Sequence, residues 1–216
     1  YPGNEYIDEI EELAKKRAKK LFGIGEDWEV NVQCLSGTPA NLAVYFGLLN
    51  PGDVIMGMSL FSGGHLSHGH KASLSGKVFN SIQYQVDSEG FLDFSQIESL
   101  ANKHKPRIII SGYSAYPRQI DFEKFGWIAK NSGAFHMVDM AHIAGLIAAG
   151  EHPSPFKHAD IVTTTTHKTL NGPRAAIVFF RKQLAGRINR AVFPGIQGGP
   201  HDNNCLLYTS PSPRDL

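Results

Sequence analysis

The stretch Ile161-Val-Thr-Thr-Thr-Thr-His-Lys-Thr-Leu-Asn-Gly-Pro173 predicts a β-strand that ends at a lysine. β-Branched residues favour an extended backbone, and Gly172-Pro173 prevents the segment from continuing as a long helix. We therefore expect Lys168 to present its amine from a rigid strand end. Such an amine can form a Schiff base with a carbonyl once it is partly deprotonated, and the cations His167 and Arg174 would favour deprotonation from nearby positions. The ordinary alternative is a solvated surface charge.

Strand-like and helix-like segments alternate on both sides of this stretch. Strands are expected at 28–32, 54–56, 77–86, 107–111, 135–139, 161–165 and 175–181. Helices are expected at 7–22, 38–49, 93–103, 121–131 and 141–148. Several strands are continuously apolar, and Gly or Pro marks the joints between elements. This pattern predicts an α/β domain with a mostly parallel sheet flanked by helices.

The composition is that of an ordinary soluble globular protein. The 216 residues are 42% hydrophobic and 19% charged, with a formal net charge of +1. Such a balance gives no sign of nucleic-acid or membrane-surface binding. Two cysteines cannot form a disulfide framework, and neither a secretory signal nor a membrane-spanning apolar run is present in the sequence. We expect a protein of the cytoplasm or the mitochondrial matrix, and not a secreted one.

Asp139 ends the strand that precedes the one leading to Lys168. A right-handed crossover places both strand ends at one edge of the sheet, where ligands of α/β proteins collect. There the two groups can hold a pyridine ring that carries an aldehyde, with Lys168 on the aldehyde and Asp139 keeping the ring nitrogen protonated. Pyridoxal phosphate is such a ring, and its protonated form accepts electrons. Asp139 is alternatively an N-cap of the following helix.

Two further segments fit the same ligand. Ser36-Gly37-Thr38 precedes a helix, and a helix N-terminus offers backbone N–H groups to a phosphate, although the same residues also make common caps and turns. His142 lies three residues after Asp139 and is expected either to orient that carboxylate or to be a structural histidine.

The segment Gly63-Gly64-His65-Leu66-Ser67-His68-Gly69-His70 contains three closely spaced histidines. Their spacing suits zinc, but no clear carboxylate or thiolate partner accompanies them. We favour no metal, and expect instead an imidazole that stacks on a planar cofactor.

Taken together, these segments resemble the serine hydroxymethyltransferase family, from about residue 4 to about residue 202. The matching stretches are 31–33, 36–41, 63–69, 138–145, 163–170, 192–195 and 197–200. The combination of Thr-Thr-Thr-Thr-His-Lys-Thr with Val-Asp-Met-Ala-His is far more specific than either part alone.

The resemblance implies an aminotransferase-like large domain, the pyridoxal phosphate fold type I, with a mostly parallel mixed sheet. It further implies catalytic roles for Lys168, His65, Asp139 and His142, with the Schiff base on Lys168 and His65 stacked on the ring. The cofactor-binding residues that it implies are Lys168, Ser36, Gly37, Thr38, His65, Ser114, Asp139, His142, His167, Arg174, Gly198 and Gly199. The last two would reach the phosphate of a neighbouring subunit, which implies a homodimer or homotetramer.

The implied reaction is the reversible transfer of the hydroxymethyl group of serine to tetrahydrofolate, giving glycine and methylenetetrahydrofolate. Two alternatives stay open: a threonine-aldolase-like pyridoxal phosphate enzyme, and a non-catalytic fragment of the family that binds the cofactor. Residues 1–203 are expected to form a partial large domain, with the small C-terminal domain missing. Residues 204–216 are Ser/Pro-rich and are expected to be an unrelated, disordered tail.

Overall fold

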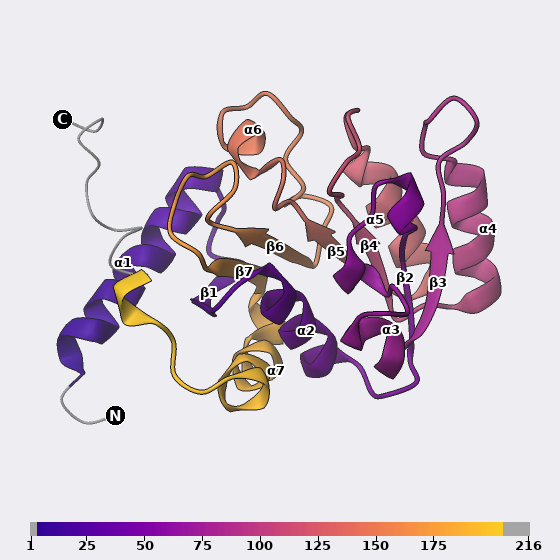
Figure 1. Ribbon diagram of the computed structural model, residues 1–216. Helices are drawn as coiled ribbons and strands as arrows, with labels where there is room; N and C mark the ends of the chain where they lie inside the picture. The colour runs from indigo at the N-terminus through magenta and orange to yellow at the C-terminus, as the bar shows by residue number, and fades with distance from the viewer. Residues whose placement is uncertain (1–3, 205–216) are drawn as a thin grey trace.

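The computed structural model describes residues 4–204, which form a seven-stranded sheet with helices on both faces (Figure 1). The strand order is β1-β7-β6-β5-β4-β2-β3. The strands are β1 Trp28–Cys34, β2 Val54–Met58, β3 Asn80–Tyr84, β4 Ile108–Ser111, β5 Phe135–Asp139, β6 Ile161–Thr165 and β7 Ala176–Arg181.

The sheet is mixed but mostly parallel, as the sequence predicts. The neighbouring strands from β3 to β6 pair in parallel, whereas β7 is antiparallel to both β6 and β1. β1 therefore runs in the same direction as the parallel strands. The carboxyl ends of β1, β4, β5 and β6 consequently lie at one edge of the sheet, where parallel α/β folds place ligands.

The helices divide into two layers that follow the two faces of the sheet. Residues of α1 Glu5–Phe22, α4 Phe94–His104, α5 Phe122–Ser132 and α6 Ala144–Ala148 share one buried apolar cluster. Residues of α2 Gly37–Leu48 and α7 Ala185–Arg190 share the other. In Figure 1, α1 lies at the end of the sheet near β1, and α4 lies at the end near β3.

The sequence of the interior strand β4 is continuously apolar because both of its faces are buried. Ile109 packs into the cluster that contains α5, while Ile108 and Ile110 pack into the cluster that contains α2. All three side chains are fully buried, because helices cover both faces of the sheet. Each such burial contributes about 2 kcal/mol, so the strand anchors both layers.

Helix α1 ends where its sequence predicts. Acidic side chains occupy its first turn and Lys19 and Lys20 its last, as the helix dipole favours. Gly23 then adopts a left-handed conformation with φ 60°, and the N–H groups of Gly23 and Ile24 donate to the carbonyls of Lys20 and Lys19. This is a Schellman-type C-cap, in which glycine avoids the steric cost of the left-handed region.

The expected strand at 77–86 is partly wrong. Lys77 and Val78 belong to a short helix, α3 Leu74–Val78, and the strand begins only at Asn80. The Lys77 N–H donates to the Ser73 carbonyl and the Phe79 N–H to the Ser75 carbonyl, so one helical turn is completed before the chain extends. A single turn is too short to give a helical periodicity in sequence.

The remaining elements are the short 3₁₀ turns η1 Leu60–Ser62, η2 Leu66–His68 and η3 Lys182–Leu184, and the kinked π-helical segment η4 Ala191–Ile196. No helix within residues 4–204 is both long and apolar enough to cross a membrane. Asn204, the first residue of the expected tail, donates from its side chain to the Arg174 carbonyl at 2.9 Å. The remainder of that tail lies outside the described residues.

Candidate active site

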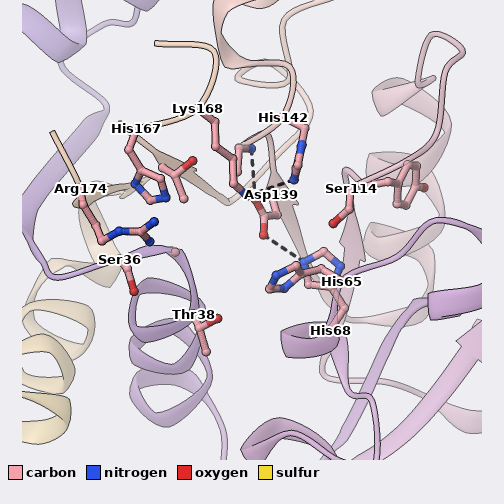
Figure 2. Close-up of a pocket in the computed structure, with 14 residues that line it drawn as sticks. Ser36, Thr38, His65, His68, Ser114, Asp139, His142, His167, Lys168 and Arg174 are labelled. Atoms are coloured by element: carbon pink, nitrogen blue, oxygen red, sulfur yellow. Dashed lines mark hydrogen bonds and ion pairs between the residues drawn. The ribbon is translucent and has the colours of Figure 1, made fainter. Parts of the chain in front are cut away.

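A pocket of about 330 Å³ opens at the carboxyl edge of the sheet (Figure 2). Its wall is assembled from the ends of four strands: Ser36 follows β1, Ser114 follows β4, Asp139 ends β5, and Lys168 follows β6. Asp139 pairs with Thr163 across β5 and β6, so the two strand ends are direct neighbours in the sheet. The crossover expected between Asp139 and Lys168 is therefore present.

All but two of the predicted site residues line this pocket, namely Ser36, Gly37, Thr38, His65, Ser114, Asp139, His142, His167, Lys168 and Arg174. Gly198 and Gly199 are exposed and lie outside it. In Figure 2, Ser36, His167 and Arg174 gather at one end of the pocket, and His65 and His68 lie near Asp139.

The Asp139 carboxylate is held by three donors. His68 Nε2 lies 3.0 Å from Oδ2, the Asn41 side-chain amide donates to the same oxygen at 2.8 Å, and the Ala141 N–H donates to Oδ1 at 3.1 Å. Burial alone would raise the pKa of this carboxyl, but the hydrogen bonds and charge of its partners outweigh burial and hold the pKa well below its usual range. Asp139 is therefore ionised and can hold a proton on a ligand nitrogen.

Of the two roles expected for His142, orienting the Asp139 carboxylate is not the one that the structure shows. Its Nε2 atom lies 3.0 Å from Nζ of Lys168, while the imidazole that contacts Asp139 belongs to His68. The loop after β5 carries His142 away from the carboxylate and toward the segment after β6. Burial, followed by the charge of Lys168, lowers the pKa of His142, so its neutral ring accepts a hydrogen bond from the lysine ammonium.

His65 presents a neutral imidazole with a fixed tautomer. The Ser67 N–H donates to its Nδ1 at 3.2 Å, which leaves the ring proton on Nε2. Burial, followed by the charge of His68, lowers the pKa of His65. A neutral ring held from one side at the wall of a pocket is suited to stack on a flat ligand.

The three histidines of residues 63–70 do not converge. His65 and His68 line the pocket, but His70 lines a separate surface depression, and its Nδ1 accepts the Ala72 N–H at 3.2 Å. Between residues 4 and 204, no group of three or more His, Cys, Asp or Glu residues is arranged to hold a metal ion.

The opposite end of the pocket suits an anion. Gly37 begins α2, so backbone N–H groups of the first turn that have no partner within the helix lie beside the Ser36 and Thr38 side chains. A Cβ on Gly37 would lie 2.8 Å from Cγ2 of Thr165, so the close approach of helix and strand requires glycine. Arg174 adds a positive charge to the same pocket. Backbone donors, hydroxyls and a guanidinium form a donor set that fits a phosphate ester.

Three buried polar atoms of residues that line the pocket have no hydrogen-bond partner among the described residues: Thr165 Oγ1, His167 Nδ1 and His68 Nδ1. Unpaired buried atoms are costly, and a ligand commonly satisfies them. Burial, followed by the charge of Arg174, lowers the pKa of His167. With an amine, an ionised carboxylate, a stacking imidazole and an anion cradle in one pocket, the residues present fit pyridoxal phosphate.

The sequence matches a family model described as serine hydroxymethyltransferase over residues 1–206. The chain belongs to the serine hydroxymethyltransferase family. A serine hydroxymethyltransferase from Desulfotalea psychrophila is 56% identical over 203 residues, which are 94% of this chain and 47% of that protein. One from Leptothrix cholodnii is 54% identical over 200 residues, which are 93% of this chain and 48% of that protein.

Both the family and the α/β fold expected from the sequence are thus confirmed. The chain spans about half the length of the curated serine hydroxymethyltransferases that it matches. The individual roles predicted for its site residues stay predictions, although most of those residues meet in one pocket.

Sequence reasoning missed the contacts of His68 and Asn41 with Asp139. The sequence pattern presents His68 as one of three closely spaced histidines, which suggests a metal ligand or a stacking imidazole but gives no sign of a contact with Asp139. Asn41 offered a clearer signal, since a polar residue among the apolar positions 40, 43 and 44 of a helix normally needs a buried partner. The identity of that partner depends on tertiary contacts.

Proposed function

We propose that the protein to which this chain belongs catalyses the reversible transfer of the hydroxymethyl group of serine to tetrahydrofolate, giving glycine and methylenetetrahydrofolate. One observation carries the proposal: Asp139 and Lys168, from neighbouring strand ends, line one pocket in a chain of the serine hydroxymethyltransferase family.

The proposed cofactor is pyridoxal phosphate. Lys168 would bind its aldehyde, Asp139 its ring nitrogen, and the start of α2 with Arg174 its phosphate. When bound, the cofactor supplies an electron sink that stabilises a carbanion at the amino-acid substrate.

The residues of the chain would control protons and orientation. Asp139, ionised and held by three donors, keeps a proton on the ring nitrogen, because a buried carboxylate in this state strongly favours a cationic partner. The neutral His142 accepts a hydrogen bond from Lys168 and so fixes the direction of the amine. His65 supplies a flat, uncharged surface. Preorganisation of this kind lowers the entropic cost of reaching a reactive geometry.

We also propose that the full-length protein is a homodimer or homotetramer. The support is the family resemblance together with the exposure of Gly198 and Gly199, which lie outside the pocket of their own subunit and are free to reach another.

The reaction is tested by following glycine formation from labelled serine with and without tetrahydrofolate. The 216-residue chain and a version extended to the length of its relatives are both assayed with added pyridoxal phosphate. Folate-dependent glycine formation that is lost in Lys168→Ala and retained in Lys71→Ala supports the proposal. Folate-independent cleavage of threonine alone would favour the aldolase alternative, and absence of turnover in the extended version would contradict the proposed reaction.

A further inference from the structure

A buried amide on α2 links two walls of the pocket. Asn41 is 1% exposed, although it does not itself line the cavity. The Thr163 hydroxyl donates to its Oδ1 at 2.7 Å. Its Nδ2 donates to Oδ2 of Asp139 at 2.8 Å and to Oγ of Ser67 at 2.9 Å. Both N–H bonds and the carbonyl oxygen of this side chain are thus engaged by residues of the site or by β6.

The orientation of the amide is determined by its partners. The ionised Asp139 carboxylate only accepts hydrogen bonds, so the NH₂ group of Asn41 must face it. The carbonyl oxygen then faces Thr163, whose hydroxyl supplies a donor. A flipped amide would place an oxygen against a carboxylate and is excluded by this arrangement.

A second branch leads to His65 through Ser67. The Ser67 hydroxyl accepts from Asn41, and its Oγ lies 2.8 Å from Nδ1 of His65. A hydroxyl has a single proton, and with Asn41 donating to its oxygen, that proton is directed to the imidazole. The same amide therefore acts on the carboxylate directly and on the imidazole through one hydroxyl.

We propose that Asn41 is a positioning residue that fixes the Asp139 carboxylate and the His65 imidazole relative to each other, so that a ring bound between them meets both. The inference rests on the proposed function for the identity of the ring, and it extends that function to a residue that does not touch the pocket. It predicts that the amide affects cofactor binding through geometry rather than through contact.

A matched control lies one turn further along α2. Tyr45 is also fully buried, and its hydroxyl donates to the backbone carbonyl of Ser67 at 3.0 Å. Tyr45→Phe removes a buried hydrogen bond to the same serine but none to Asp139. A purely structural role for this face of α2 would make Asn41→Ala and Tyr45→Phe behave alike.

The first test needs no cofactor. In Asn41→Asp, a carboxylate replaces an amide that lies 2.8 Å from Asp139, and two carboxylates so close cannot both be ionised. We expect carbon NMR of aspartate-labelled protein to show, in this variant, an additional carboxyl that titrates well above the ordinary value of about 3.9. Unchanged aspartate titrations would overturn the contact between Asn41 and Asp139.

The second test uses pyridoxal phosphate as the probe, with the wild-type chain, Asn41→Ala and Tyr45→Phe. We expect Asn41→Ala to weaken binding by about tenfold or more, the effect of losing a hydrogen bond to a charged group, and to shift the absorbance maximum of the bound cofactor. Tyr45→Phe should bind within about twofold of the wild type and leave the spectrum unchanged, since its lost bond does not reach a charged group.

The two tests distinguish a failure of the inference about Asn41 from a failure of the proposed function. Equal affinity and an identical spectrum in Asn41→Ala and the wild type would overturn the inference while leaving the proposed function intact. A wild-type chain that binds no pyridoxal phosphate would instead contradict the proposed cofactor, and the carboxyl titration would still decide whether Asn41 sets the state of Asp139.

Discussion

Nε2 of His68 lies 3.0 Å from Oδ2 of Asp139, and the imidazole is 1% exposed. Because the ionised carboxylate only accepts hydrogen bonds, the proton between the two atoms belongs to the imidazole. His68 Nδ1 is buried and has no partner among the described residues, so the interaction with Asp139 is the one hydrogen bond identified for this ring. The imidazole thus stabilises the ionised form of a carboxyl whose pKa burial alone would raise.

His68→Ala is expected to change the dependence of stability on pH. The folded-state pKa of Asp139 is depressed, so its ionisation stabilises the fold above its ordinary value of about 3.9, and this contribution is lost as the pH falls toward the folded-state pKa. Removing His68 raises the folded-state pKa, and we expect the free energy of unfolding to drop by about 1–3 kcal/mol at pH 7. Urea unfolding from pH 3 to pH 7 measures it.

His70→Ala is the control for that experiment, because His70 belongs to the same segment but lines a different depression. It should leave the pH profile unchanged. Parallel profiles for His68→Ala and the wild type would show that the imidazole does not hold the Asp139 charge.

Gly37→Ala is expected to weaken pyridoxal phosphate binding. The new Cβ would lie 2.8 Å from Cγ2 of Thr165, so the first turn of α2 must move away from the strand end. We expect a loss of about tenfold in affinity, the effect of misplacing one or two charge-assisted hydrogen bonds. Thr165→Ser in the same protein removes the opposing methyl group and should restore binding. A double variant as weak as Gly37→Ala would contradict this steric explanation.

Lys168→Met is expected to raise the pKa of His142. Burial and then the lysine charge lower that pKa, and methionine retains most of the bulk without the charge. Since a lowered histidine pKa reduces stability as the pH falls through about 6.5, the variant should also lose less stability in that range. Nitrogen NMR of the histidine rings follows the titration. An unchanged His142 titration in the variant would contradict the contact between Lys168 and His142.

Arg181→Ala is expected to destabilise the whole domain. The guanidinium donates to the carbonyls of Ala159 and Phe156 at 3.2 and 2.9 Å, pairs with Asp27, and lies 4.4 Å from the centre of the Trp28 ring. Its removal leaves two carbonyls without this donor, and we expect the free energy of unfolding to fall by about 2 kcal/mol or more. Lys182 is the next residue and is exposed, so Lys182→Ala should change the free energy of unfolding little. Equal effects of the two substitutions in urea unfolding would contradict this.

Much of the fold is predictable because its signals are local. The β-branched run before Lys168 and the apolar run of β4 each predict a strand, and Gly23 predicts a helix end that the structure shows. Topology rules then predict that Asp139 and Lys168 share an edge. Such inferences depend on backbone preferences and on connections between successive elements.

The hydrogen-bond partners within the site are harder to predict than the fold, because they depend on contacts between segments that are distant in the sequence. His142 is close to Asp139 in sequence, yet its ring turns to Lys168, while His68 and Asn41 reach the carboxylate from elsewhere in the chain. The helix α3 has only five residues, which give too little periodicity for its sequence to predict it. The sequence therefore predicts most of the residues that line the pocket, but not every hydrogen-bonded pair among them.

The most direct measurement of the central claim is the location of the amine that captures the cofactor. The chain is mixed with pyridoxal phosphate, reduced with borohydride, digested and analysed by mass spectrometry. We predict a single stoichiometric adduct on the peptide containing Lys168, and its loss in Lys168→Ala but not in Asn41→Ala at saturating cofactor. A stoichiometric adduct on another lysine, or none at all in the wild-type chain, would contradict the account.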